Sequence, residues 1–418
     1  MINKKSRILL LVIFLIAFAL RLGYNACFVG LNTPPASYIG ADDGDYDKLG
    51  WHLANGQGYS IVEGELTAYR APGYPFFLAF MYKVFGRNYS VIRIVQSLFD
   101  AVSCILIFLI AAKLLGTNVA FVSSAIYAIY PFSVHYTGWI CTESLFIMGF
   151  LLLTLLLLRI RADTKIFYPF FCGLVLGFLA LVKSQMLVFY PFLLIWLFFS
   201  LRGRIRAFMR TAVAIVIGLI IVVTPWTLRN YKVFNRIVLM TTMGGESLLC
   251  CNNEISLNDP RGKYVISVME LDGVRETVEP LDEVDRDEAY RKLAVDFIRK
   301  NLTKMPLFVF HKIRQLFDPI PLPKVKDRWI VIFSYGLLFP FMCLGLVLSF
   351  RYYKRFLLIY VAIAFNIAIA AVFVGFSRQR ASIEPFLIMF ASYAVIYLIS
   401  TSIAKIENFN YRKEAKNA

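Results

Sequence analysis

The stretch 209–226 reads MRTAVAIVIGLIIVVTPW and contains a single charged residue, Arg210. In an α-helix, eighteen residues extend about 27 Å, close to the roughly 30 Å of hydrocarbon in a bilayer. Similar apolar blocks recur along the 418 residues, of which 59% are hydrophobic and only 17% charged. Water-soluble domains are about half apolar and about a quarter charged. The sequence therefore excludes soluble single-domain, disordered and fibrous proteins, and it predicts a polytopic membrane protein.

About ten transmembrane helices are predicted, so the expected fold is an all-α membrane bundle. The expected spans are residues 8–29, 91–115, 118–136, 143–159, 167–183, 186–201, 209–226, 329–349, 355–376 and 381–401. The apolar segment 74–86 carries Lys83, so we expect it to lie at the membrane interface. The first span follows basic residues as in a signal peptide, but its apolar stretch is too long, and we expect a retained anchor.

Basic residues gather in the short loops on one side of this topology. If the N-terminus is cytoplasmic, the inner loops hold Arg159, Arg161, Lys165, Arg202, Arg204, Arg206, Arg210, Arg351, Lys354 and Arg355. Because Lys and Arg are enriched in cytoplasmic loops, we expect both termini to be cytoplasmic. The net charge of +17 is then an orientation signal and a match to anionic inner-leaflet lipids. No basic stripe with interleaved aromatics indicates nucleic-acid binding.

Nearly all acidic residues outside the inner loops fall in two long outer segments, 30–90 and 227–328. We accordingly predict an N-terminal transmembrane module at 1–226 that contains the first outer segment. The outer-face segment 227–328 follows, and a C-terminal transmembrane module with a short cytoplasmic tail occupies 329–418. Within 227–328 we expect an amphipathic helix at 285–301, then an interfacial helix that carries Phe308, Phe310 and Phe317.

The first outer segment holds four carboxylates in six residues: Asp42, Asp43, Asp45 and Asp47. Like charges repel, so a cation, a basic partner or solvent must stabilise them. Neighbouring carboxylates can raise the pKa of an acid towards a value useful for a general base. An acidic helix N-terminus with solvated side chains explains the same residues equally well.

Cations on the outer side oppose the positive-inside rule. Arg70, in the rigid stretch AYRAPGYP at 68–75, could pair with the acids or a lipid phosphate, or be an ordinary interfacial arginine. A single outer cation usually snorkels to the interface. Several on the carboxylate side indicate an anion site, for which phosphate is the natural ligand; they are Lys183, Arg229, Arg378 and Arg380. Glu143 opens a span there, whereas Asp100 lies within a span and is either paired or functional.

The motifs of common soluble enzymes are absent. The sequence has no phosphate-binding loop, no serine nucleophile elbow and no zinc-binding His-Glu-x-x-His helix. Three histidines are too few for a histidine-rich metal site. A divalent cation held by carboxylates remains open, with Asp43 and Glu143 as its candidate ligands.

An ordered set of motifs resembles a known family. The set comprises Asp42 with Asp43, Gly56-x-Gly58-Tyr59, Arg70-x-Pro72-Gly73-Tyr74-Pro75, Arg93 with Gln96, Thr142 with Glu143, Pro225 with Trp226, Arg229 with Asn230, Asn252 with Asn253, and Arg378-x-Arg380. In this order they resemble the membrane-embedded glycosyltransferases of the GT-C type. The nearest branch is the bacterial relatives of protein O-mannosyltransferase and lipid A aminoarabinose transferase. The acidic pair is Asp-Asp where Asp-Glu is common, so the neighbouring Asp45 remains an alternative base.

The resemblance implies transfer of a hexose or pentose from a polyprenyl-phosphate donor to a glycan, lipid or protein acceptor at the outer face. It implies that Asp42 is the general base, that Asp43 supports the acceptor or an ion, and that Glu143 orients the base or binds a metal. The substrate-binding residues implied are Asp45, Arg70, Lys183, Arg229, Arg378 and Arg380. One-step displacement by the acceptor would invert the anomeric carbon.

A transporter or flippase of lipid-linked sugars is the alternative function. It would use the same cations to hold phosphate, and it predicts polar residues along a path through the bilayer and internal symmetry. The polar residues concentrate on one face and no internal repeat is present, which favours the enzyme. A membrane scaffold would leave the outer acids and cations without a common purpose.

Overall fold

The computed structural model describes residues 4–35, 42–258, 268, 271, 273–319, 332–373, 375 and 377–417, with the side chains of 377 and 403–417 excepted. Within these ranges the chain is helical and contains no β-strand, and an isolated antiparallel bridge joins Ser60 to Leu66. The all-α class is therefore confirmed for the described residues.

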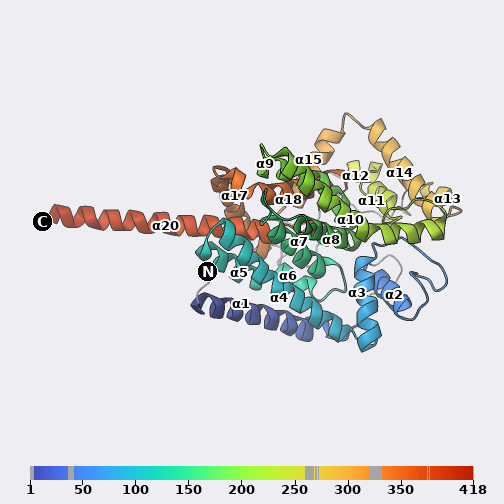
Figure 1. Cartoon of the computed structure of the whole chain (residues 1–418), viewed down its shortest axis with the longest axis horizontal. Helices are drawn as coiled ribbons and strands as arrows, with labels where there is room; N and C mark the ends of the chain where they lie inside the picture. Colours follow the sequence, from blue (N-terminus) through green and yellow to red (C-terminus); the bar gives the residue numbers. More distant parts are fainter. Residues whose placement is uncertain are drawn as a thin grey trace.

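The first half of the chain builds the centre of the bundle (Figure 1). Its helices are α1 (Lys4–Tyr24, extended by a π turn at Asn25–Val29), α2 (Asp42–Ala54), α3 (Gly73–Phe85), α4 (Tyr89–Leu114), α5 (Thr117–Ala128), α6 (Pro131–Tyr136), α7 (Glu143–Leu157), α8 (Phe167–Val182), the 3₁₀ turn η2 (Ser184–Val188), α9 (Phe189–Ser200) and α10 (Ile205–Phe234).

The second half forms the helices of the 227–328 segment and the last apolar helices. They are α11 (Gly244–Cys250), α12 (Glu254–Asn258), α13 (Val274–Val278), α14 (Glu283–Lys300), α15 (Met305–Leu316), the π turn η4 (Ile332–Gly336), α17 (Leu337–Phe350), α18 (Tyr353–Val372), α19 (Ser377–Arg380) and α20 (Glu384–Asn417).

Six helices of the described chain are long and apolar enough to cross a membrane. They are α1 with its π turn, α4, α10, η4 with α17, α18, and α20. Three further apolar helices, α7, α8 and η2 with α9, are shorter. A polytopic membrane protein is thus supported, whereas the number of ten spans stays a prediction.

Two predicted spans differ from the helices observed. The stretch 118–136 is not one helix, because α5 ends at Ala128 and Pro131 starts α6; proline lacks the N–H that a continuing helix requires. Conversely, α10 passes through Pro225 and ends at Phe234, beyond the predicted end at 226. The extra turns after residue 226 carry Arg229.

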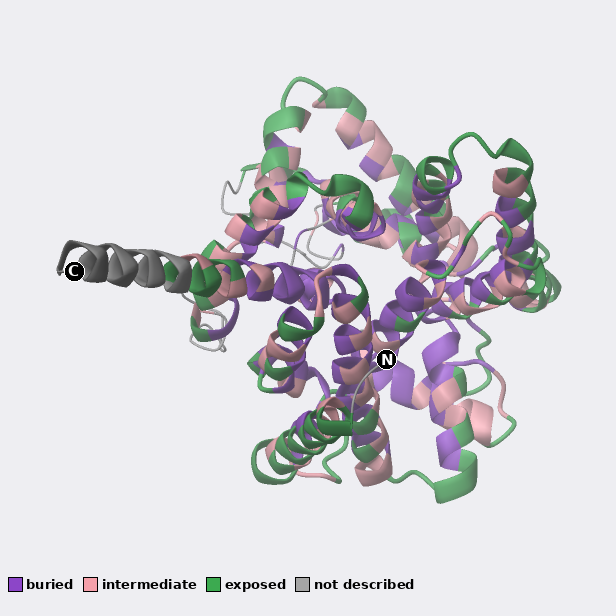
Figure 2. Cartoon of the chain, turned by 60° about the vertical axis from the view of Figure 1, so that its left-hand side comes forward, coloured by how far each residue is buried: buried purple, intermediate pink, exposed green. Residues whose placement is uncertain are grey.

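The lipid-facing surface is recognisable by large apolar side chains that no other helix covers. On α1 these include Leu11, Leu15 and Leu20, and on α10 they include Ile220 and Ile221. Exposed apolar area of this extent is unfavourable in water and favourable in hydrocarbon. Buried residues instead concentrate where the helices converge, as Figure 2 shows.

Helices α8 and α10 approach closely because glycines form their contact. A Cβ atom on Gly173 would lie 2.1 Å from the carbonyl oxygen of Ile215, and one on Gly218 would lie 2.4 Å from that of Phe170. Small residues at such crossings allow membrane helices to pack backbone to backbone.

A buried ion pair joins the first two long spans. Arg21 Nε lies 2.5 Å from Asp100 Oδ2, and the hydroxyl of Tyr127 donates to the other carboxylate oxygen at 2.7 Å. Further donors of Arg21 reach the carbonyl of Ala128 and the hydroxyl of Ser133. Of the two alternatives for Asp100, pairing with a neighbouring span is the one observed.

The two predicted outer segments meet at one end of the molecule. In Figure 1, α2, α3 and α13 lie at the right-hand end, whereas α1 begins and α20 ends towards the left. The amphipathic helix predicted at 285–301 is present as α14, and the helix predicted after it is present as α15, which ends just before Phe317. Of its aromatics, Phe310 is exposed but Phe308 is buried, so Phe308 does not face the interface.

Candidate active site

Helix α2 presents two of its carboxylates to one arginine. Asp42 and Asp45 are three residues apart and therefore lie on the same helical face. Arg70 contacts both: Nη1 lies 2.7 Å from Asp42 Oδ1, and Nη2 lies 2.7 Å from Asp45 Oδ2. Asp45 is completely buried, and the ring of Tyr69 lies under the guanidinium, 4.9 Å from its carbon. The interpretation of these acids as solvated is therefore wrong for Asp45.

Arg378, from the short helix α19, bridges two carboxylates. Its Nε donates to Glu143 Oε1 at 2.7 Å and its Nη2 donates to Oε2 at 3.2 Å, a bidentate arrangement. Its Nη1 donates to Oδ2 of Asp42. Both oxygens of Asp42 thus have an arginine partner.

Lys183 completes the cluster, with Nζ at 3.3 Å from Glu143 Oε1 and 5.0 Å from the ring centre of Phe146. Carboxylates and positively charged side chains alternate along these contacts. We call this set of six residues the charge network: Asp45, Arg70, Asp42, Arg378, Glu143 and Lys183. Its formal charges sum to zero, so an added anion would compete with the existing carboxylates for the arginines.

Close helix contacts bring these residues together. A Cβ atom on Gly73 would lie 2.8 Å from backbone atoms of Leu181 and Val182, so only glycine allows α3 to begin beside the end of α8. This contact places the segment that carries Arg70 next to the turn that carries Lys183.

The turn before Glu143 is held by two side chains of α4. Arg93 Nε donates to the carbonyl of Gly138 at 3.0 Å, and Gln96 Nε2 donates to the carbonyl of Trp139 at 2.8 Å. Arg378 lies 6.0 Å from the ring centre of Trp139. Arg93 and Gln96 therefore hold the backbone of the turn that precedes Glu143.

The ion pairs decide the protonation of Asp42. Burial by itself raises the pKa of this carboxyl, but Arg378 and Arg70 outweigh burial and hold the pKa below the ordinary value of 3.8. Burial disfavours the charged form of Arg378, yet Glu143 and Asp42 raise its pKa well above the ordinary value. The expectation that neighbouring acids raise the pKa of the base is wrong for Asp42, because the two arginines outweigh both burial and Glu143.

The other acids of α2 face different surroundings. Oδ1 of Asp43 accepts the backbone N–H of Gly44 at 3.1 Å. Asp47 is buried and pairs with Arg87 at 2.5 Å, while the hydroxyl of Tyr82 donates to it at 2.6 Å. Asp47 therefore joins α2 to the α3–α4 connection, away from the charge network.

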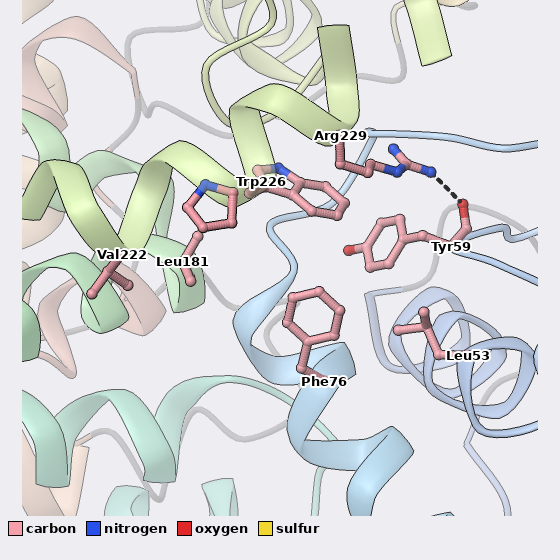
Figure 3. Close-up of a pocket in the computed structure, with 8 residues that line it drawn as sticks. Leu53, Tyr59, Phe76, Leu181, Val222, Trp226 and Arg229 are labelled. Atoms are coloured by element: carbon pink, nitrogen blue, oxygen red, sulfur yellow. Dashed lines mark hydrogen bonds between the residues drawn. The ribbon is translucent and has the colours of Figure 1, made fainter. Parts of the chain in front are cut away.

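Arg229 lines an apolar groove instead of joining the charge network. Its guanidinium lies 4.9 Å from the ring centre of Trp226 and donates to the carbonyls of Thr67 and Tyr59. The groove has a volume of about 260 Å³. Its lining residues are Leu53, Tyr59, Phe76, Leu181, Val222, Pro225, Trp226 and Arg229. Figure 3 shows the aromatic side chains facing one another across it, with Arg229 at one end.

Tyr59 connects this groove to the charge network. Its ring lines the groove, and its hydroxyl donates to the carbonyl of Arg70 at 2.8 Å. The groove therefore adjoins the segment that presents Arg70 to Asp42.

Arg380 contacts a different set of groups from Arg378. It is 1% exposed and donates to Glu384 at 2.9 Å and to the carbonyl of Leu316 at 2.9 Å. Its guanidinium carbon lies 3.4 Å from the ring centre of Tyr335. These contacts support a structural role for Arg380.

One supporting residue gave no signal in the sequence. Glu283, at the start of α14, accepts the backbone N–H of Ala68 at 2.8 Å and the hydroxyl of Thr242. Thr242 in turn donates its N–H to the carbonyl of Ala68 at 3.1 Å. The 227–328 segment thus fixes the backbone next to Arg70. Glu283 is one of many acids in that segment, so only the fold distinguishes it.

The donor set does not fit a metal ion well. Across the described ranges, no three His, Cys, Asp or Glu side chains cluster as metal ligands would. Both oxygens of Glu143 accept hydrogen bonds from Arg378, and Lys183 adds a second positive charge beside them. Cations at these positions disfavour a divalent ion, so we assign no step to one.

Known proteins resemble the chain in part of its sequence and in its fold. Residues 69–227 match the family described as dolichyl-phosphate-mannose-protein mannosyltransferase. This range holds Arg70, Glu143 and Lys183. No curated protein matches the chain.

Among solved structures, the fold is similar to the oligosaccharyltransferase of Archaeoglobus fulgidus in complex with zinc and sulfate. The TM-score is 0.57 at 15% identity, over 94% of this chain and 49% of that one. The AglB enzyme of the same organism, in complex with an inhibitory peptide and a dolichol-phosphate, gives a TM-score of 0.54 at 14% identity, over 99% and 52%. This chain thus spans about half the length of those proteins.

ArnT from Cupriavidus metallidurans, bound to undecaprenyl phosphate, is more distant, with a TM-score of 0.43 at 12% identity over 94% of this chain and 78% of that one. The fold assignment comes from the archaeal structures. The chain is thus a membrane protein whose fold is similar to that of the archaeal oligosaccharyltransferase, and its residues 69–227 match the family described as dolichyl-phosphate-mannose-protein mannosyltransferase.

Proposed function

We propose that the protein transfers a sugar from a polyprenyl-phosphate donor to an acceptor at the outer face of the membrane. The observation that carries the proposal is the bridge from Arg378 to Asp42 and Glu143. It sets a candidate base and a candidate phosphate ligand side by side. The archaeal structure with bound dolichol-phosphate supports this donor class by likeness of fold.

In the proposed reaction the donor phosphate first competes with Asp42 for Arg378. A phosphate offers a guanidinium two acceptor oxygens, as a carboxylate does, and carries at least as much charge. Loss of this contact raises the proton affinity of Asp42, because one of the two cations that depress its pKa is now engaged elsewhere. Donor binding therefore frees one carboxylate oxygen of Asp42 to act as a base, while Arg70 still holds the other oxygen.

The transfer itself is a single displacement. Asp42 takes the proton of the acceptor hydroxyl as its oxygen attacks the anomeric carbon. The bond from that carbon to the phosphate oxygen breaks, and its electron pair leaves with the phosphate. Arg378 stabilises the charge that develops there. Attack opposite the leaving group inverts the anomeric configuration.

The remaining parts of the site have separate roles in this proposal. Glu143 holds Arg378 from the other side, and Lys183 balances the charge of Glu143. The apolar groove near Arg229 accepts the isoprenoid chain of the donor, because its lining is mainly aromatic and aliphatic. In this proposal both termini are cytoplasmic, as the basic loops favour, and the charge network lies on the outer side.

Transfer by the purified protein in liposomes tests the proposal. Undecaprenyl phosphates that carry different hexoses and pentoses are offered with glycan, lipid and peptide acceptors, and products are detected by mass spectrometry. We expect transfer by the wild type and by E65Q, a matched control for an exposed acid of the same outer segment. Because a general base contributes about 10²- to 10⁴-fold, D42N should lose that much activity while still binding undecaprenyl phosphate.

Turnover by D42N at the wild-type rate would remove Asp42 as the base. Movement of the lipid-linked sugar across the liposome membrane without product would instead support the transporter alternative. Absence of both transfer and undecaprenyl phosphate binding by the wild type would overturn the proposed function.

A further inference from the structure

A buried lysine of the outer helix α15 has no role in the reaction proposed above. Lys312 is 5% exposed. Its ammonium contacts neutral groups among the described residues: Nζ donates to Asn252 Oδ1 at 2.8 Å and to the carbonyl of Val372 at 3.3 Å, and it lies 4.5 Å from the ring centre of Phe308. Burial lowers its pKa to about 8. A buried cation without a carboxylate is costly, so its position requires an explanation.

The contacts of Lys312 hold the end of α18. Val372 is the last residue of that helix, and its carbonyl also accepts the side-chain N–H of Asn252 at 3.0 Å. The carbonyl oxygens at a helix C-terminus lack partners within the helix and attract positive charge. Lys312 and Asn252 together satisfy this one.

Beyond α18, Gly375 packs directly against α15. A Cβ atom on Gly375 would lie 2.1 Å from the carbonyl oxygen of Lys312 and 2.7 Å from the backbone nitrogen of Leu316. No side chain fits at such a distance. The backbone at 375 is thus packed against the backbone of α15.

A third contact lies at the end of α19. Arg380 Nη1 donates to the carbonyl of Leu316, the last residue of α15, at 2.9 Å. Helix α15 therefore contacts three points of the chain between α18 and α20: Val372 at the end of α18, Gly375, and Arg380 at the end of α19. Arg378 lies between the second and third of these points and projects to Asp42 and Glu143.

We propose that α15 is a positioning element for Arg378 and that Lys312 is its central positioning residue. The inference rests on the proposed function only for the identity of the ligand of Arg378. Lys312 fixes the end of α18, and Arg380 fixes the end of α19. The guanidinium of Arg378, which lies between these two points, is thereby held in the orientation that contacts both Asp42 and Glu143. Loss of the Lys312 contact frees the end of α18 and lets Arg378 move. Arg378 then binds an anion more weakly.

A double-mutant cycle on lipid binding tests this role. Undecaprenyl phosphate is titrated against the purified full chain in detergent for wild type, K312M, R378A and K312M/R378A. We expect K312M to weaken binding on the order of tenfold in the wild-type background and not at all in the R378A background, because Lys312 acts through Arg378. K312R, which keeps a cationic donor, should recover most of the loss.

The matched control is Y190F, which removes another hydrogen bond from a side chain to a backbone carbonyl, that of Tyr190 to Ala212 at 2.9 Å on the α9–α10 side. It should leave lipid binding unchanged. Equal weakening by K312M in both backgrounds would show a merely structural role and overturn the inference.

Hydrogen–deuterium exchange separates this inference from the proposed function. Without any ligand, K312M should speed amide exchange at residues 377–383 relative to wild type and Y190F. If wild type binds no undecaprenyl phosphate, the proposed donor is wrong, yet faster exchange in K312M still supports positioning by α15. Unchanged exchange at 377–383 in K312M would overturn the positioning role whatever the ligand is.

Discussion

The guanidinium of Arg378 donates to the carboxylate of Asp42 across 336 residues of sequence. The same guanidinium holds Glu143 through two further hydrogen bonds. One planar cation thus sets the relative position of two acids that begin two different helices, Asp42 in α2 and Glu143 in α7. The predictions below follow from this arrangement and from the contacts that support it.

Replacement of Arg378 by lysine should remove most of the activity. An ammonium is a point charge and cannot hold Glu143 in a bidentate manner while it also reaches Asp42. We expect R378K to lower kcat by about 10²- to 10³-fold, the usual cost of losing one donor to a developing charge. The comparison is single-turnover transfer by wild type, R378K and R378A; wild-type rates in R378K would exclude a bridging role.

The stability of the protein should depend on pH through Asp42. Its pKa in the folded state lies below the ordinary value of 3.8, so the ionised form stabilises the fold. This contribution is fully present above the ordinary value and is lost as the pH falls through the lowered one. The difference in melting temperature between wild type and D42N in detergent should therefore be constant from pH 7 to 5 and shrink below about 3.8. A difference that grows on acidification would contradict the assignment.

The Arg21–Asp100 pair should be important for stability rather than for chemistry. Removal of one partner leaves an uncompensated buried charge, at a cost of about 3–5 kcal/mol. We expect R21M and D100N each to unfold at lower denaturant concentration than wild type. The double variant R21M/D100L should be less destabilised than R21M, since no lone charge remains. Equal stability of R21M and wild type would show that the pair contributes little.

Gly73→Ala should disturb the site through the backbone. The new Cβ would lie 2.8 Å from backbone atoms at the end of α8, so α3 must shift, at a cost of about 1–3 kcal/mol. Because α3 follows the Arg70 segment, we expect lower activity as well as a lower melting temperature. Gly23→Ala is the control, since a Cβ at Gly23 meets nothing within 4 Å. Equal effects of the two substitutions would argue against this contact.

Filling the apolar groove should impair donor binding. Val222 lines the groove of about 260 Å³, and tryptophan at this position would occupy much of it. We expect V222W to weaken the binding of undecaprenyl phosphate about tenfold or more, because the isoprenoid chain loses its buried apolar contacts. The adjacent Ile221 is exposed, so I221W tests the effect of added bulk alone. If V222W binds undecaprenyl phosphate as tightly as I221W does, the isoprenoid chain does not bind in this groove.

Much of the fold could be predicted because its signals are local. An apolar run such as 209–226 must be helical in a bilayer, where each backbone polar group needs a partner within its own segment. Helices α3 and α14 were likewise evident from composition and periodicity. The predicted helix boundaries differ from the observed ones at two prolines. Pro131 starts a new helix, whereas α10 continues through Pro225. Neighbouring helices determine which of these occurs.

Composition and pattern alone were enough to predict a basic, helical membrane protein with acids clustered in the segment 30–90 and several cations outside the predicted cytoplasmic loops. They could not distinguish among those cations, because a charged residue looks the same whether it meets a substrate, a carbonyl or a carboxylate. Tertiary structure brought Arg70, Arg378 and Lys183 into the charge network, placed Arg229 in the apolar groove, and buried Arg380 against α15. The physical reason is that such contacts depend on where separate helices end and how closely their backbones pack.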